Sequence, residues 1–385
     1  MKSILAYGFR PHFFLAGVAA LILIPVWVLN FTASVSMSTD WPPTLWHAHE
    51  MLFGFIACAI AGFLLTAVPS WTGQKGYAGT PLAVMASIWL AARIMIATAA
   101  NWPPVVVAVI DLAFLPVLMV LVGIPLLRSR NRNTPLLFAV LLLWLSNVWF
   151  HWALMQHDPS LARRAIMSGI NLVLILLTVI GGRIIPAFTT SGLKQSGVVV
   201  TSHPLISTFT ISGMILLAAS DLLWPEKPVT AVVAASAAVF HVIRLMQWKT
   251  ARTLKHPIIW ILHVAYAWLP IGLVLKALAI FGIYAGSFWL HALTIGALST
   301  MIVAVVTRAS LGHTGRPLIV HPAITVAYLM LTAAAFTRVF AMALFKLEYS
   351  TMILLSAVLW SIAFAIYLYI YTPILWRPRV DGKPG

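Results

Sequence analysis

Ionisable side chains open a long apolar segment near the start of the chain. The segment runs from Trp46 to Gly73, and its first residues include His47, His49 and Glu50. A stretch of this length with so few charges is typical of a membrane-spanning helix. Ionisable groups are costly inside a bilayer, so those that occur there usually have a function. Imidazoles commonly bind transition metals and carboxylates often orient them, so these three residues indicate a metal centre.

Two more histidines are expected at the depth of this group. His151 lies near the outer end of one predicted span, and His291 lies near the outer start of another. An α-helix turns about 100° per residue, so His47 and His49 point about 200° apart and do not easily bind one metal. They would serve two centres, or one would be a ligand and the other a hydrogen-bond partner.

A second candidate pair is His241 with His263. The two lie about equally far from the loop between the predicted spans 229–248 and 257–281, so on antiparallel helices they reach equal depth. This spacing suits a pair of metal ligands, and it equally suits a polar contact between neighbouring helices. The other histidines are expected at the membrane surface or in a loop: His12, His157, His203, His256, His313 and His321.

Four charged residues fall within or near predicted spans: Arg93, Asp111, Lys276 and Arg338. An unpaired charge at the bilayer centre costs at least ~2.5 kcal/mol. We therefore expect pairing among these residues or with the carboxylates of a cofactor, unless Lys276 and Arg338 extend to the headgroups. Asn147, one helical turn before His151, could hydrogen-bond either His151 or a neighbouring helix.

The composition identifies the class of protein that must position these groups. The 385 residues are 62% hydrophobic and 8% charged, whereas soluble domains carry about 25% charged residues. We expect an all-α, polytopic membrane bundle that forms a single integral membrane domain over residues 1–385. The one cysteine, Cys58, excludes disulfides and thiolate clusters within the chain. Hydropathy predicts about twelve spans: 12–34, 46–69, 81–100, 104–127, 135–156, 163–185, 204–222, 229–248, 257–281, 287–307, 320–344 and 350–373.

Basic residues set the expected orientation. With alternating spans, the N-terminus, the C-terminus and every second loop share one side, which holds Lys2, Arg10, Lys75, Arg128, Arg130, Arg132, Arg183, Lys194, Lys249, Arg252, Lys255, Arg308, Arg316, Arg377, Arg379 and Lys383. The opposite loops hold Arg163, Arg164, Lys227 and Lys346. The positive-inside rule then places both termini in the cytoplasm. Topology thus accounts for the net charge of +16, and no soluble basic module that could bind nucleic acid is expected.

Two segments look alike in outline. Each begins near a tryptophan and a histidine and ends on Thr-Gly: residues 46–73 and residues 289–315. The second and tenth spans are not equivalent in a repeat of six plus six, so the similarity favours two helices that serve one site.

Taken together, the motifs resemble the NnrS family of bacterial haem- and copper-containing membrane proteins of the nitric oxide response. The residues that carry the resemblance are Gly8-Phe9-Arg10-Pro11, Trp46–Gly73, Asn147–His151, Gly182–Thr189, Trp260–Gly272 and His291–Pro317. They span nearly the whole chain in the expected order. His12 departs from the family pattern, in which a phenylalanine follows the Arg-Pro pair, and His241 lies outside the motifs.

The resemblance implies haem and copper as cofactors. It makes His47, His49, His151, His263 and His291 candidate metal ligands, and it adds Glu50, Arg183 and Arg308 as candidate cofactor-binding residues. No catalytic residue is assigned. The chain is also similar in outline to the haem–copper oxidase core, but its seventh span lacks an adjacent histidine pair and its tenth has one histidine, so oxygen reduction is not expected.

The hypothesis that follows is a multi-pass haem/copper protein of the bacterial inner membrane. It would act in the response to nitric oxide and nitrosative stress, or in the handling of nitric oxide linked to denitrification, with nitric oxide or another small diatomic molecule as its ligand. Two alternatives use the same features differently. A secondary transporter would have a similar span count, but it should show a symmetric repeat with broken helices, and Pro69, Pro186 and Pro270 do not correspond. A haem or metal shuttle would share the histidines but would pass its metal to a partner.

Overall fold

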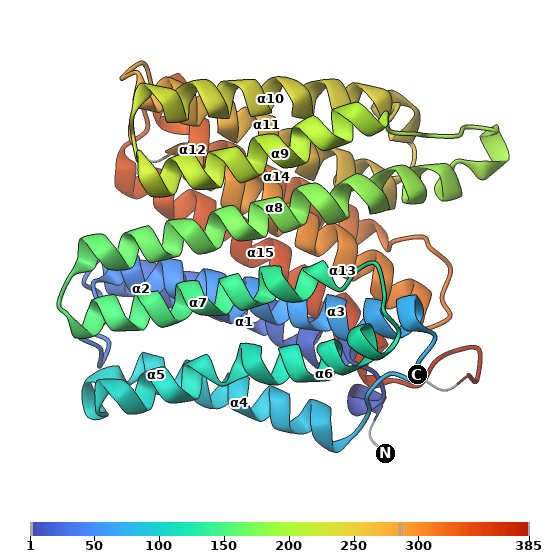
Figure 1. Ribbon diagram of the computed structural model, residues 1–385, viewed down its shortest axis with the longest axis horizontal. Coiled ribbons are helices and arrows are strands. Elements are labelled where there is room, and N and C mark those ends of the chain that lie inside the picture. Colours follow the sequence, from blue (N-terminus) through green and yellow to red (C-terminus); the bar gives the residue numbers. More distant parts are fainter. Residues whose placement is uncertain (1–2, 285, 287, 384–385) are drawn as a thin grey trace. The chain divides into compact units, whose positions relative to one another are not determined.

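The computed structural model describes residues 3–284, 286 and 288–383, and its regular elements in this part of the chain are all helical (Figure 1). Lys2 lies outside the described residues. Twelve helical segments in the described chain are long and apolar enough to cross a membrane, as the sequence predicts.

The spans follow the predicted order closely. They are α1 (Phe9–Phe31), α2–η2–α3 (Pro43–Thr72), α4 (Thr80–Ala97), α5–α6 (Pro104–Arg128), α7 (Pro135–Met155), α8 (Pro159–Gly192), α9 (Pro204–Leu223), α10 (Pro228–Gln247), α11 (Pro257–Ile280), α12–η6–α13 (Phe288–His313), α14 (Pro322–Phe345) and α15 (Tyr349–Trp376). Short 3-10 helices are η1 (Ser3–Leu5), η3 (Ala99–Asn101), η4 (Lys194–Ser196) and η5 (Thr250–Thr253). Many spans begin at proline, which suits the first helical position because its missing N–H needs no partner there.

Helix α8 differs most from its predicted limits. Hydropathy predicts 163–185, whereas the helix runs from Pro159 to Gly192. The difference arises because a hydropathy window reports only the apolar part of a helix, and the polar turns at both ends remain helical. At the end of α3, Gly73 adopts a left-handed conformation (φ 69°) and stops the helix, as expected for this position.

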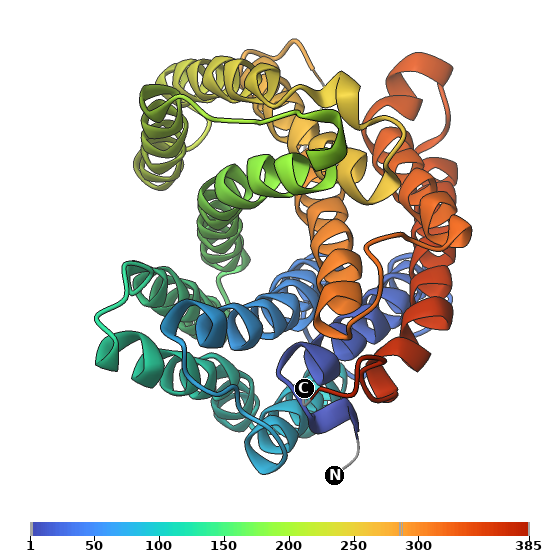
Figure 2. The same ribbon diagram turned by 90° about the vertical axis from the view of Figure 1, so that its right-hand side faces the viewer.

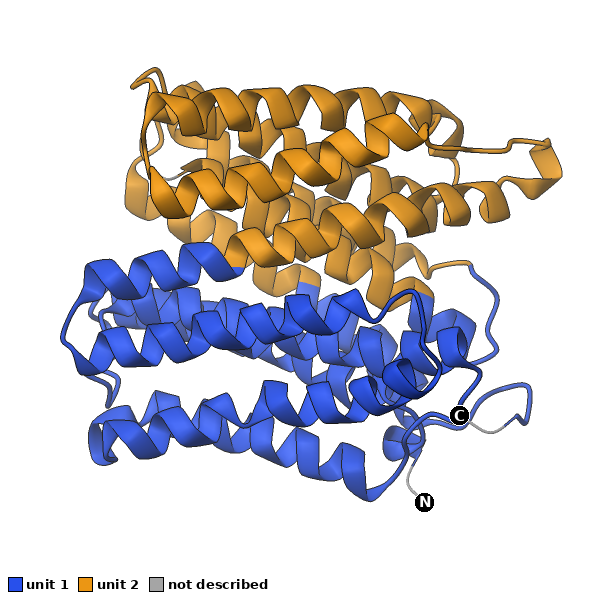
Figure 3. Ribbon diagram, viewed as in Figure 1, with its two compact units in different colours: residues 1–169, 309–318, 364–385 blue, residues 170–308, 319–363 orange. Residues whose placement is uncertain are grey.

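The chain forms two compact units (Figure 3). Unit 1 comprises residues 1–169, 309–318 and 364–385, and unit 2 comprises residues 170–308 and 319–363. In unit 1, α1 packs against α3 and η2, α3 against α6, and α6 against α7. In unit 2, α10 lies between α9 and α11, and η6 packs against α11 and α14. Figure 2 views these helices nearly end-on.

The start of the first span and the end of the last span meet within unit 1. Buried Arg10 donates hydrogen bonds of 2.8 Å to the backbone oxygens of Leu375 and Arg377. A cation at this position satisfies carbonyl groups that the end of α15 leaves without helical partners. Gly8 lies so close to α3 that a Cβ there would be 2.3 Å from the Leu65 Cβ. The Gly-Phe-Arg-Pro motif is therefore explained by packing.

Among the described residues, two spans contain a π-helical segment, and in both the segment begins directly after a histidine. Segment η2 (Glu50–Ile56) lies between α2 (Pro43–His49) and α3 (Ala57–Thr72). Segment η6 (Ala292–Ser299) lies between α12 (Phe288–His291) and α13 (Thr300–His313). π-helices are rare and occur frequently at functional sites.

The similarity between these two spans is closer than the sequence outline indicates. An ungapped alignment pairs His49 with His291, Gly54 with Gly296, and Thr72-Gly73 with Thr314-Gly315. Gly73 and Gly315 both have positive φ, 69° and 74°. Each π segment also receives a tryptophan from a neighbouring helix: Trp89 donates to the Gly54 oxygen at 2.8 Å, and Trp268 packs on Gly296. The second and tenth spans thus share a histidine followed by a π-helical segment, a tryptophan contact at the glycine of that segment, and a glycine with positive φ at the end.

Candidate metal centre

A group of buried polar side chains comes from four spans of unit 1. His49 and Glu50 lie at the junction of α2 and η2, Arg93 on α4, and Asp111 on α5 (Pro104–Leu112). Helix α7 contributes Asn147 and His151. All six side chains are buried, in a chain that is 62% hydrophobic.

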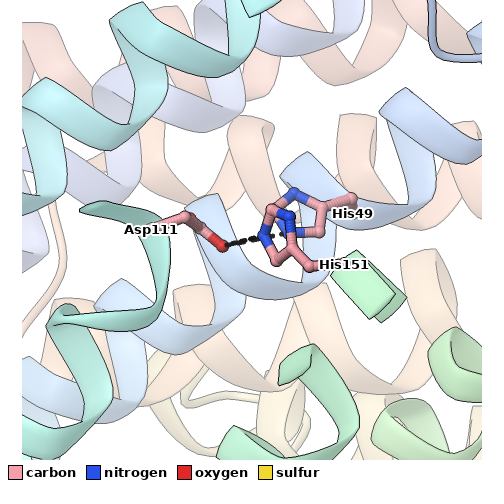
Figure 4. Close-up of side chains that lie close together, drawn as sticks. All are labelled: His49, Asp111 and His151. Carbon is pink, nitrogen blue, oxygen red and sulfur yellow. Dashed lines mark hydrogen bonds and ion pairs between the residues drawn. The ribbon is translucent and has the colours of Figure 1, made fainter. Parts of the chain in front are cut away.

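The centre of the group is the carboxylate of Asp111, towards which both imidazoles point (Figure 4). Its Oδ2 lies 3.0 Å from His151 Nε2 and 3.2 Å from His49 Nε2. The three potential ligand atoms all lie within 4.8 Å of one another. Two imidazole nitrogens and a carboxylate oxygen form a donor set that suits several first-row transition metals.

His49 faces oxygen atoms on both sides of its ring. Its Nδ1 lies 3.1 Å from Glu50 Oε1, and its Nε2 lies 3.0 Å from Asn147 Oδ1 and 3.2 Å from Asp111 Oδ2. A carboxylate beside one ring nitrogen fixes the proton there and turns the other nitrogen's lone pair towards a metal. A neutral His49 would then place Nε2 against two oxygens with no proton between them. The geometry therefore favours a cation at Nε2, either a second proton or a metal ion.

The balance of charge supports the same conclusion. Glu50 and Asp111 are two buried carboxylates, and Arg93 binds both: its Nη1 donates to Glu50 Oε1 at 2.7 Å and its Nη2 donates to Asp111 Oδ1. With neutral imidazoles the group carries one net negative charge. A buried unneutralised charge is costly, so a bound cation would stabilise the group.

Aromatic rings enclose the group. The ring of Phe150 stacks on His49 with centroids 4.7 Å apart, and that of Phe53 lies 5.0 Å from it. Trp41, in the loop before α2, lies edge-on to His49 at 5.3 Å and to His151 at 5.7 Å. These apolar walls keep the local dielectric low and strengthen each electrostatic contact inside.

Within unit 1, the structure brings three members of the predicted outer group together and gives His47 other neighbours. His49, Glu50 and His151 come together, whereas the half-buried His47 ring stacks on Trp27 at 4.3 Å. His47 and His49 thus contact different neighbours, as the helical period indicates. His291 belongs to unit 2, where it is half-buried at the junction of α12 and η6.

The predicted inner pair makes separate contacts in unit 2. His263 Nε2 lies 2.9 Å from Thr189 Oγ1 and its Nδ1 lies 3.0 Å from Thr250 Oγ1. His241 Nδ1 instead lies 2.7 Å from Tyr266 Oη. Of the two arginines implied as cofactor-binding residues, Arg183 is exposed on α8, and Arg308 is buried with its guanidinium 4.2 Å from the Phe188 ring.

The sequence does not predict Asp111 as a metal ligand, although it predicts that this charge within a span needs a partner. The pairing of Arg93 with Asp111 is confirmed, as is the contact of Asn147 with neighbouring helices: it bonds His49 and Asp111. Helical depth is the sequence signal that could have connected Asp111 with His49. Asp111 lies seven residues after Pro104, and His49 lies six after Pro43, at equal depth from the same side.

Comparison with known proteins gives one family. A family model described as NnrS protein matches residues 3–379. The match includes both spans with π segments and every member of the buried group. A search of curated proteins found no match.

Proposed function

The chain belongs to the NnrS family, and on that premise we propose that it is a histidine-ligated metalloprotein of the bacterial inner membrane that acts in the response to nitric oxide. The observation that carries the proposal is the buried His49–Asp111–His151 group, which we call the triad. The family suggests the nitric oxide role, and the triad supplies a place for a metal within a membrane-spanning segment.

Copper and haem are the cofactors that the family resemblance implies. A haem iron offers imidazoles only two positions, on opposite faces of the macrocycle. The triad instead brings three donor atoms from three helices around one point, so it fits a metal ion without a macrocycle. We therefore assign copper to the triad. Bound there, copper would supply a coordination position that can accept nitric oxide.

The residues around the triad would orient the metal ligands and limit the access of water. Glu50 orients His49 through Nδ1, and Arg93 fixes Glu50 and Asp111 in turn. Trp41, Phe53 and Phe150 exclude water from the imidazoles. An uncharged diatomic molecule would cross these apolar walls more readily than water or ions would.

Haem is assigned to histidines outside the triad. The candidates are His47, His263 and His291. Arg183 and Arg308 would suit the propionates of a haem at His263, because Arg308 contacts Phe188 and His263 contacts Thr189, the next residue of α8. The equivalence of His291 and His49 within their spans supports His291 most, because each histidine directly precedes a π segment. A buried cation such as Arg308 would be neutralised by a carboxylate.

Metal analysis of single variants tests this assignment. Purified wild type should contain copper by elemental analysis and a Soret band from haem. His49→Ala, Asp111→Ala and His151→Ala should lose copper and its EPR signal while they keep the Soret band. His291→Ala should lose haem and keep copper, and the exposed His256→Ala should lose neither. Copper retained in all three triad variants would refute the assignment.

A further inference from the structure

A buried arginine in unit 2 has only neutral hydrogen-bond partners among the described residues. Arg244 lies on α10 and is 2% exposed. Its Nη1 donates to the Thr178 backbone oxygen at 2.9 Å and to Tyr266 Oη at 3.4 Å, and its Nη2 donates to Ser207 Oγ at 3.4 Å. No carboxylate of the described chain forms an ion pair with it, in contrast to Arg93 in unit 1.

One edge of this guanidinium lacks a short hydrogen bond. Nε is buried and has no partner in the described chain, and Nη2 has only the long contact with Ser207. Carboxylates and other planar oxyanions bind arginine through two parallel N–H···O bonds, for which the Nε–Nη2 edge is suited. The short bond to Thr178 lies on Nη1, so it holds the side chain without using this edge.

His241 lies one turn earlier on the same face of α10 and adds a donor. Arg244 donates to Tyr266 Oη, so the single proton of that hydroxyl is directed to His241 Nδ1, 2.7 Å away. The ring proton of a neutral His241 is then on Nε2. That nitrogen is buried and has no hydrogen-bond partner among the described residues.

The position of Arg244 is fixed by packing. A Cβ on Gly182 would lie 1.8 Å from Arg244 Nη2, so the guanidinium lies directly on the α8 backbone. The Trp248 ring lies 5.6 Å from its Cζ and is itself held by a 2.7 Å bond from Nε1 to Ser202 Oγ. An arginine that extends to lipid headgroups would be exposed at its tip, whereas Arg244 is directed into the protein.

We propose that the Nε–Nη2 edge of Arg244, together with His241 Nε2 and Ser207 Oγ, binds a planar anion in unit 2. The site does not depend on the triad, but the two sources of its ligand rest on the proposed function. The chemistry fits a carboxylate or a small inorganic oxyanion. Two sources can supply it: a propionate of bound haem, or free nitrite or nitrate, which are the oxidation products of nitric oxide.

The test measures anion binding to purified protein by isothermal titration calorimetry, with and without haem. Nitrite and nitrate should bind one site per chain and chloride should bind more weakly, because two oxygens match two parallel N–H donors better than one spherical ion does. Arg244→Gln should weaken nitrite binding at least about tenfold. Arg244→Lys should weaken it as well, because it keeps the charge and loses the planar edge. Arg252→Gln, an exposed arginine just after α10, should change nothing.

The outcomes separate the two sources and can refute the site. Binding of nitrite to haem-loaded protein identifies a free oxyanion. Binding only after haem removal, with faster haem loss in Arg244→Lys, identifies a propionate. Equal binding by wild type and both Arg244 variants, or equal affinity for chloride, would overturn the proposal, as would no nitrite binding together with unchanged haem retention. Copper content of the triad reports separately on the proposed function.

Discussion

At the scale of single residues, the candidate metal centre depends on the Asp111 carboxylate, which contacts side chains from several spans. Asp111 Oδ2 is approached by His49, His151 and Asn147, while its Oδ1 accepts from Arg93. Each contact comes from a different span or a different turn, so no short sequence motif contains the group. This explains why histidine spacing identified two of its members and why Asp111 was found only in three dimensions.

Glu50 should control metal affinity without touching the metal. Glu50→Gln replaces the carboxylate that fixes the Nδ1 proton of His49 with an amide. Loss of such an orienting partner typically lowers metal affinity about 10- to 100-fold. Competition with a chelator of known affinity measures the change. Glu348→Gln, an exposed loop carboxylate, is the control, and equal affinity in both variants would contradict the role of Glu50.

Arg93 should matter for stability even in metal-free protein. Arg93→Met leaves Glu50 and Asp111 buried without their common cation. Removal of one partner from a buried ion pair costs about 3–5 kcal/mol. Thermal unfolding in detergent checks this cost. The double variant Arg93→Met/Asp111→Asn should recover part of it, because one of the two buried charges is then removed, and strictly additive losses would argue against direct coupling.

At the scale of elements, the span limits follow from sequence much better than the interior of the spans does. Apolar length and proline at the first turn determine where helices begin. Hydropathy and proline positions do not predict the π segments η2 and η6, because a π turn changes the backbone hydrogen-bonding pattern without changing the composition. Their position after His49 and His291 becomes visible only from the backbone, and it changes which side chains the following residues contact.

Gly54 in η2 should be needed to seat Arg93. A Cβ at this position would lie 2.8 Å from Arg93 Nη1 and 3.3 Å from Arg93 Cδ. Gly54→Ala should therefore displace the guanidinium and destabilise the protein by about 1–3 kcal/mol, as overpacking typically does. Gly123→Ala in α6 is a matched control, since its nearest neighbour would be Leu137 Cδ1 at 3.5 Å. It should be neutral or stabilise by up to about 1 kcal/mol, and chemical denaturation compares the two.

At the scale of the whole molecule, the membrane topology depends on the twelve potential spans of the described chain and on the side of the membrane that each loop faces. The contact of Arg10 with the end of α15 places the first and last helix ends on one side, as an even number of crossings requires. Helix packing carries no information about which side that is. The distribution of lysine and arginine does, and it supports our proposal that this side is the cytoplasm.

Thiol labelling of single cysteines should establish that orientation. In a Cys58→Ala background, Gln156→Cys lies at the exposed end of α7 and Arg132→Cys lies in the exposed loop before that helix, so the two report opposite sides. With cytoplasmic termini, a membrane-impermeant maleimide should label Gln156→Cys in spheroplasts and should label Arg132→Cys only after lysis. The reverse pattern would invert the topology and would place the triad near the cytoplasmic face. Because α7 carries His151 one turn before its end, the same experiment also fixes the side from which nitric oxide and copper would approach the triad.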